Sequence, residues 1–206
     1  MSTTTDFIHT WVPGTSARTL LMLHGTGGTE NDLVPLGRTL DPEANLLSPR
    51  GKVLENGMPR FFRRLAEGVF DEEDLIRRTH ELATFLAHAA KKYEFDAGKL
   101  VAVGYSNGAN IAGSLLLLEP GALAGAALIR PMVPLVPEEQ PDLTGVPVLI
   151  AAGAHDPIVP AAEAKELAAL LGKAGAAVSV SVEDAGHNLT GQTVETTRKW
   201  LADLAR

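Results

Sequence analysis

The stretch GYSNGAN, residues 104–110, places a serine midway between two glycines. It follows the apolar run LVAV and leads into the helix-like stretch NIAGSLLLL. The pattern G-x-S-x-G is typical of a tight strand-to-helix turn that exposes a serine hydroxyl, and small neighbours are needed because the backbone there is strained. We therefore predict that Ser106 is a nucleophile and that Gly104 and Gly108 permit the turn. A chance match and an ordinary serine N-cap are the plainer alternatives.

A serine hydroxyl is a weak nucleophile until a base takes its proton, so a histidine and an acid should accompany it. Two later strand-like runs end in such residues: 146–152 is followed by Asp156, and 178–182 is followed by His187. His187 would be the base, and Asp156 would hold the tautomer of its imidazole. The chain order serine, aspartate, histidine is the order that α/β-hydrolases use.

Each of these assignments has a competitor. Asp156 precedes Pro157 and could be a plain helix N-cap, and His187 could be an ordinary loop histidine. Glu183 and Asp184 compete with Asp156 for the role of the acid. Both lie so close in sequence to His187 that their geometry at the strand end is less suitable.

Attack on an ester creates an oxyanion, which requires fixed hydrogen-bond donors. The apolar run 19–23 ends in the glycine-rich loop HGTGG. We predict that the backbone N–H of Thr26, in this loop, and that of Asn107, directly after the nucleophile, are the two donors. Gly25 is expected to line the substrate site. The loop lacks the G-K-[ST] sequence of a phosphate-binding loop, and no H-E-x-x-H spacing supports a metal site.

The elements that must position these residues alternate along the chain. Strand-like runs alternate with helix-like runs, and most inner runs are apolar throughout, as in parallel strands covered on both faces. This order predicts an α/β fold with a mostly parallel, doubly wound sheet, whose sites form outside the carboxyl ends of the strands. The expected strands are 7–12 (an edge strand), 19–23, 44–48, 100–103, 125–129, 146–152 and 178–182, and the expected helices are 71–93, 109–118, 160–173 and 191–205.

The composition bounds the class of protein. A chain of 206 residues predicts one domain, 1–206. A net charge of −7 argues against nucleic acid or an anionic membrane as the main partner. The absence of cysteine excludes a thiol nucleophile, disulfides and zinc–thiolate sites. Neither a signal peptide nor an apolar run of about 20 residues is visible, so a cytoplasmic location is expected.

Taken together, the motifs resemble a known family. LHGTGG, GYSNGAN, AHDPIVP and DAGHNLT look like the phospholipase/carboxylesterase family of α/β-hydrolases, and segment 49–75 is similar to small bacterial serine hydrolases of the hydroquinone-resistance and copper-inducible type. The resemblance implies an α/β-hydrolase fold of about seven strands without a large lid domain, no cofactor, and a homodimer as an ordinary state. It also implies carboxylesterase activity on small, short-acyl or aromatic esters through an acyl-enzyme, with Ser106, Asp156 and His187 as the triad and Thr26 and Asn107 as oxyanion donors.

The substrate side of the site is less determined. Segment 51–70 interleaves basic and apolar residues, among them Phe61, and is either a short cap over the pocket or a surface loop anchored by its aromatics. Arg130 stands at a strand end where larger relatives carry small polar residues; it would bind a substrate carboxylate or pair with an acid. Ile158 follows the acid and is expected to line the pocket. A cap this short should leave an open site that favours small esters.

Three functions stay open at this stage. The first is a serine esterase for small carboxylic esters, and the second is an acyl thioesterase or lysophospholipase. The third is a non-catalytic ligand-binding protein, because a fold does not determine a function. The complete set of nucleophile, base, acid and oxyanion loop favours an enzyme.

Overall fold

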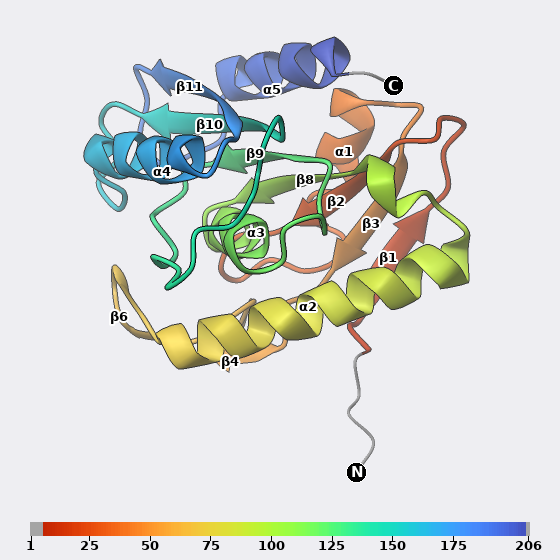
Figure 1. Cartoon of the computed structure of the whole chain (residues 1–206), viewed down its shortest axis with the longest axis horizontal. Coiled ribbons are helices and arrows are strands. Elements are labelled where there is room, and N and C mark those ends of the chain that lie inside the picture. Colours follow the sequence, from red (N-terminus) through yellow and green to blue (C-terminus); the bar gives the residue numbers. More distant parts are fainter. Residues whose placement is uncertain (1–5, 205–206) are drawn as a thin grey trace.

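The computed structural model describes residues 6–204 and arranges their longest strands in one seven-stranded sheet (Figure 1). All neighbouring strands are parallel except the edge pair β1–β3, which is antiparallel. The mostly parallel, doubly wound sheet is therefore confirmed. In spatial order the strands are β1 (His9–Val12), β3 (Asn45–Pro49), β2 (Thr19–Leu23), β8 (Leu100–Tyr105), β9 (Gly125–Ile129), β10 (Pro147–Gly153) and β11 (Ala177–Glu183).

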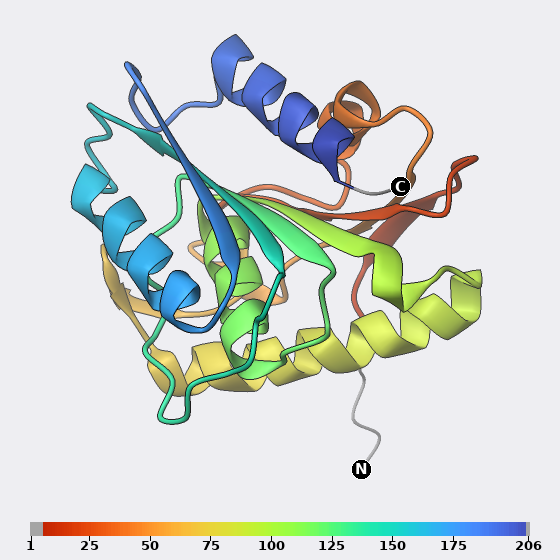
Figure 2. The same cartoon turned by 45° about the horizontal axis from the view of Figure 1, so that its top comes forward.

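Helices cover both faces of the sheet. The helices are α1 (Val34–Leu40), α2 (Glu72–Tyr93), α3 (Asn107–Leu118), α4 (Ala161–Lys173) and α5 (Gly191–Asp203), with a short 3-10 turn at Ala97–Lys99. Figure 2 shows α1 and α5 on one face and α2, α3 and α4 on the other. In β2, Leu20 and Met22 join the core beneath α1 and α5, whereas Leu21 and Leu23 join the other core. Burial on both faces explains why this strand is apolar throughout.

Local signals account for both ends of α2. The carboxylate of Asp71 accepts a hydrogen bond from the N–H of Asp74 and caps α2, whose last turn carries Lys91 and Lys92, as suits the helix dipole. The sequence did not predict α1. This helix is seven residues long, contains Pro35 and Gly37, and has no side-chain cap, so packing must stabilise it.

Segment 51–70 forms two small antiparallel hairpins rather than an irregular loop. They are β4 (Val53–Glu55) with β5 (Met58–Arg60), and β6 (Arg64–Ala66) with β7 (Val69–Phe70). Asn56 and Gly57 join the first pair with φ angles of 50° and 80°. Two positive φ angles define the type I′ turn that Asn-Gly favours, because it matches the twist of the strands.

Candidate active site

Ser106 stands at a strained turn between β8 and α3. Its φ of 52° and ψ of −115° lie in a region that residues other than glycine rarely adopt, at a cost of about 1–3 kcal/mol. A Cβ at Gly104 would lie 2.5 Å from the carbonyl oxygen of Gly108, and a Cβ at Gly108 would lie 2.0 Å from that of Leu23. Both glycines are therefore required by close backbone contact, and the predicted strand–turn–helix is present.

The imidazole of His187, from the loop between β11 and α5, lies between Ser106 and Asp156. Its Nε2 is 3.0 Å from the Ser106 Oγ, and its Nδ1 is 2.7 Å from an Asp156 carboxylate oxygen. A proton on Nδ1 donates to the carboxylate, which leaves Nε2 free to accept the serine proton. The three predicted residues thus form one unbroken hydrogen-bonded chain.

Asp156 is held as a carboxylate. Its side chain is 1% exposed. Its second oxygen accepts hydrogen bonds from the N–H of Ile158 at 2.8 Å and from the N–H of Val159 at 2.9 Å. Burial raises the pKa of Asp156, but the N–H of Val159, the imidazole of His187 and the N–H of Ile158 outweigh it and hold that pKa below its ordinary value. An ionised acid is what a protonated imidazole needs beside it.

The two competing acids point elsewhere. Glu183 is buried and forms an ion pair with Arg130. Asp184 is 91% exposed on its side chain and lies 2.7 Å from His155 at the surface. The geometry therefore favours Asp156 as the partner of His187.

The two expected oxyanion donors lie beside Ser106. Thr26 lies in the loop after β2, and Asn107 is the first residue of α3. Both residues line the same pocket as the serine. Within residues 6–204 neither backbone N–H has a protein acceptor. A free N–H at a helix N-terminus suits a developing negative charge, because the helix dipole is positive there.

Strand β5 supports the Thr26 loop. The N–H of Gly27 donates to the carbonyl of Pro59 at 2.9 Å, and the guanidinium of Arg60 donates to the Thr26 hydroxyl at 2.6 Å. The loop of one expected donor is therefore tied to the first hairpin by two hydrogen bonds.

His24 fastens the start of the same loop. Its Nδ1 is 2.7 Å from the carbonyl of Gly25, and its Nε2 accepts the N–H of Gly51 at 3.0 Å. Burial lowers the pKa of His24, so the ring is neutral and this pair of bonds fixes its tautomer. His24 is thus a structural residue.

Phe61 requires a correction. It was expected to bind substrate, but its side chain is 2% exposed and belongs to the core rather than to the pocket lining. Its backbone approaches the site instead, since its N–H donates to the Asn107 side-chain oxygen at 2.8 Å. Phe61 thus contacts Asn107, whose backbone N–H is the second expected oxyanion donor.

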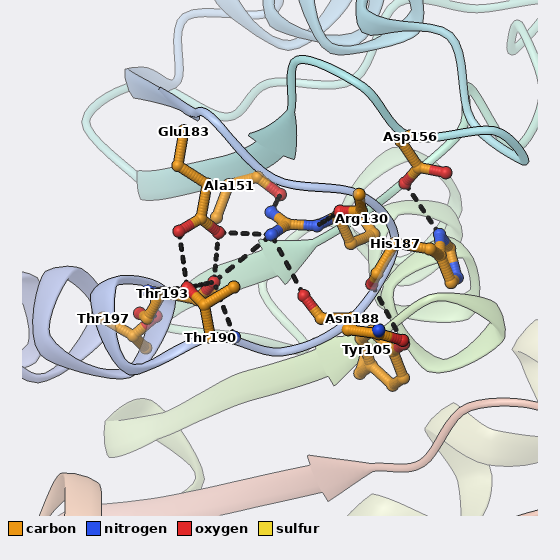
Figure 3. A network of polar contacts seen from close by, with 11 residues as sticks. Tyr105, Arg130, Ala151, Asp156, Glu183, His187, Asn188, Thr190, Thr193 and Thr197 are labelled. Atoms are coloured by element: carbon orange, nitrogen blue, oxygen red, sulfur yellow. Dashed lines mark hydrogen bonds and ion pairs between the residues drawn. The ribbon is translucent and has the colours of Figure 1, made fainter.

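Arg130 requires a second correction. Its side chain is fully buried and does not line the pocket. Of the two roles considered for Arg130, binding a substrate carboxylate or pairing with an acid, the structure supports the second, because Arg130 forms an ion pair with Glu183 (Figure 3). It also donates to the carbonyls of Gly186 at 3.0 Å and Asn188 at 3.2 Å. These two residues flank His187, and therefore Arg130 orients the histidine loop from beneath rather than meeting a ligand.

Tyr105 completes the support of that loop. Its hydroxyl donates to the carbonyl of His187 at 3.0 Å, so three successive carbonyls, 186–188, are held by side chains (Figure 3). Burial raises the pKa of Tyr105, which keeps the hydroxyl protonated and able to donate. Sequence reasoning missed Tyr105, although it stands directly before the nucleophile.

A pocket of about 330 Å³ opens over the serine. Gly25, Thr26 and Ile158 line it, as expected. Segment 51–70 contributes five further lining residues, which fits the cap interpretation of that segment: Arg60, Arg64, Glu67, Gly68 and Phe70. Outside that segment, the lining residues that sequence reasoning did not assign to the pocket are Tyr105, Asn110, Met132 and Val159.

The part of the chain that the structure describes holds neither a candidate metal cluster nor a helix that could span a membrane. No group of three or more His, Asp or Glu side chains there is arranged to hold a metal ion. None of the helices in residues 6–204 combines the length and apolar character needed to cross a membrane.

Comparison with known proteins assigns the chain to a family. Residues 13–205 match the family model described as Phospholipase/Carboxylesterase. The chain belongs to the phospholipase/carboxylesterase family. Members of this family are serine hydrolases with the α/β-hydrolase fold, which confirms the resemblance, the fold and the expectation of a hydrolase.

Similar proteins cover nearly the whole chain. MhqD of Bacillus subtilis, which is named as a hydrolase, is 54% identical over 195 residues, 95% of this chain and 98% of that protein. The crystal structure of the Bacillus cereus carboxylesterase has 54% identity and a TM-score of 0.93, covering 95% of this chain and 93% of that one. The structure of YahD with malic acid has 29% identity and a TM-score of 0.91, covering 96% and 99%.

Proposed function

We propose that the protein is a serine carboxylesterase that hydrolyses small carboxylic esters through an acyl-enzyme. The observation that carries this proposal is the unbroken chain from Ser106 through His187 to Asp156, with the serine raised on a strained turn. A serine in an ordinary helix cap would have neither the base at 3.0 Å nor the positive φ. The carboxylesterase relative agrees with this reaction class.

The first half of the reaction forms the acyl-enzyme. Nε2 of His187 takes the proton of the Ser106 hydroxyl while Oγ bonds to the ester carbonyl carbon and the carbonyl oxygen becomes an oxyanion. The N–H groups of Thr26 and Asn107 donate to that oxyanion. The carbonyl then re-forms, the bond to the alcohol oxygen breaks, and His187 gives its proton to the departing alcohol.

The second half releases the acid. A water molecule loses a proton to His187 and attacks the acyl carbon, and the same donors bind the second oxyanion. When the carbonyl re-forms, the bond to Oγ breaks and the proton returns from His187 to Ser106. Throughout, Asp156 stabilises the charged imidazole without taking its proton.

The size of the pocket favours small substrates. Its volume of about 330 Å³ lies at the lower end of the usual range for ligand pockets, about 300–1,000 Å³. YahD, determined with malic acid, is a relative seen with a small polar acid. In a series of esters from acetate to palmitate we expect the short acyl chains to be hydrolysed best, and a preference for palmitate would refute this part of the proposal. Matched thioesters and a lysophospholipid test the thioesterase and lysophospholipase alternatives.

A fluorophosphonate probe tests the nucleophile directly. We expect one covalent adduct, located at Ser106 by mass spectrometry, and none in Ser106→Ala. Folded wild-type protein that is not labelled, and that hydrolyses no ester faster than Ser106→Ala does, would favour the ligand-binding alternative.

A further inference from the structure

Two arginines of the hairpin segment line the pocket together with Ser106. Arg60 ends β5 and Arg64 begins β6, and both residues belong to the pocket lining. An ester carbonyl is neutral, and the mechanism described above assigns its oxyanion to the N–H groups of Thr26 and Asn107, so it gives no role to two cations beside the serine. Arg60 donates a hydrogen bond to the Thr26 hydroxyl, whereas Arg64 makes no hydrogen bond to the Thr26 loop within residues 6–204.

The carboxylate of Glu55 fixes both arginines. Nε of Arg64 donates to its two oxygens at 2.9 and 3.1 Å, and Nε of Arg60 lies 3.3 Å from one of them. Arg60 also donates to the carbonyl of Phe62 at 3.2 Å. The side chain of Arg60 is 4% exposed and that of Arg64 is 27% exposed. The guanidinium of Arg64 is therefore oriented before any ligand arrives, with part of it open to the pocket.

The carboxylate of Glu55 does not neutralise both Arg60 and Arg64. Two guanidinium groups share the one carboxylate of Glu55, and burial together with the charge of Arg64 lowers the pKa of Arg60. Glu67, on the exposed turn between β6 and β7, lines the pocket from the rim. The outer nitrogens of Arg64 donate to no protein acceptor within residues 6–204. A planar guanidinium with free outer N–H groups matches a carboxylate bidentately.

We propose that Arg64, oriented by Glu55 beside Arg60, binds a carboxylate of the substrate, so that the preferred substrates are small esters that carry a free carboxylate. This inference rests on the proposed esterase function and names its substrate class. The carboxylate lies on the acyl part or on the alcohol part of the ester, and substrate pairs of both kinds distinguish the two.

Matched esters that differ only in charge provide the test. The first pair is para-nitrophenyl hydrogen adipate and para-nitrophenyl methyl adipate, followed by nitrophenolate release. The second pair is meta-acetoxybenzoate and its methyl ester, followed by chromatography of the phenols. For each variant the readout is kcat/KM for the charged ester divided by kcat/KM for the neutral one. Because both values come from the same preparation, a loss of folded protein cancels in this ratio.

We expect Arg64→Gln to lower the ratio about tenfold for at least one pair, since a charge-assisted hydrogen bond in a partly exposed site is lost. Arg63→Gln is the matched control: its side chain is 65% exposed, pairs with Asp71 and does not line the pocket. It removes the same charge and should leave the ratio unchanged. Added salt should lower the wild-type ratio but have little effect on that of Arg64→Gln.

The proposal is overturned if Arg64→Gln keeps the wild-type ratio in both pairs, or if Arg63→Gln lowers the ratio as much. Should Arg64→Gln fail to fold, Glu67→Gln takes its place: removing this rim carboxylate should raise the ratio, and an unchanged or lower ratio contradicts the proposal. Failure of the esterase function itself would look different, because wild-type protein would then hydrolyse neither neutral ester faster than Ser106→Ala does.

Discussion

At the scale of single residues, the acid is the member of the site with the most rivals in the sequence. Asp156 is buried, hydrogen-bonded by two backbone N–H groups and 2.7 Å from His187, whereas Asp184 points into solvent. The difference lies in what each carboxylate contacts, since both follow strand ends at the same edge of the sheet.

Replacing Asp156 with Asn should lower kcat for a short ester by about three to four orders of magnitude, because the amide cannot stabilise the charged imidazole and favours the wrong tautomer of His187. Hydrolysis of para-nitrophenyl acetate measures this. Asp184→Asn, which removes the same charge from the exposed rival, should retain wild-type kcat. Equal losses in the two variants would refute the assignment of Asp156.

At the scale of elements, the first hairpin and the residue after it contact the loops of the proposed oxyanion donors. Residues 59–61 make one hydrogen bond to each of Gly27, Thr26 and Asn107. The hairpin lies outside the seven-stranded sheet, so this support comes from a separate two-stranded element rather than from the central sheet. Displacement of a donor by even a small distance weakens transition-state binding more than substrate binding.

Thr26→Val keeps the backbone N–H and the shape of residue 26 but removes the acceptor that Arg60 contacts. We expect kcat for a neutral short ester to fall about tenfold while KM changes less, because the loss concerns the oxyanion. Thr29→Val is the control in the same loop, since the Thr29 hydroxyl meets only exposed partners near the surface. An unchanged kcat in Thr26→Val would show that the hairpin contact does not position this donor.

At the scale of the whole molecule, the buried pair of Arg130 and Glu183 links β9, β11 and the start of α5. Burial raises the pKa of Glu183, but hydrogen bonds from Thr190, Thr193 and Arg130 outweigh it and hold the pKa below its ordinary value of 4.5. Because the folded-state pKa is depressed, this group contributes stability above about pH 4.5 and loses that contribution as the pH falls through the folded-state pKa.

Glu183→Gln should therefore lower the free energy of unfolding at neutral pH by about 3 kcal/mol, since Arg130 would be left as an uncompensated buried charge. It should also make the loss of stability at acid pH shallower than in wild type. Thermal melts from neutral pH down to about pH 3 measure both effects. Glu195→Gln removes an equal charge from an exposed pair on α5 and should leave the curve nearly unchanged. Parallel acid limbs in wild type and Glu183→Gln would contradict this prediction.

The homodimer that the resemblance implies stays a prediction. Light scattering of the purified protein would check it.

The sequence by itself determined the features that depend on neighbours along the chain. Apolar runs predicted all seven strands of the sheet, and G-x-S-x-G predicted the turn at Ser106, because both patterns reflect local backbone geometry. Ser106, Asp156 and His187 follow the parallel strands β8, β10 and β11, which also brought these residues to one edge, since the carboxyl ends of parallel strands meet there. The Asn56-Gly57 turn was likewise a local signal, and sequence reasoning passed over it.

Only the tertiary structure decided which side chains meet the pocket. Arg130 follows the expected strand 125–129 and Arg60 lies in segment 51–70, yet one pairs with Glu183, 53 positions away, and the other contacts Thr26, 34 positions away. The side chain of Phe61 lies in the core for the same reason, because the apolar residues that it packs against come from distant segments of the chain. A side chain's direction depends on contacts between elements, and no local pattern records those contacts.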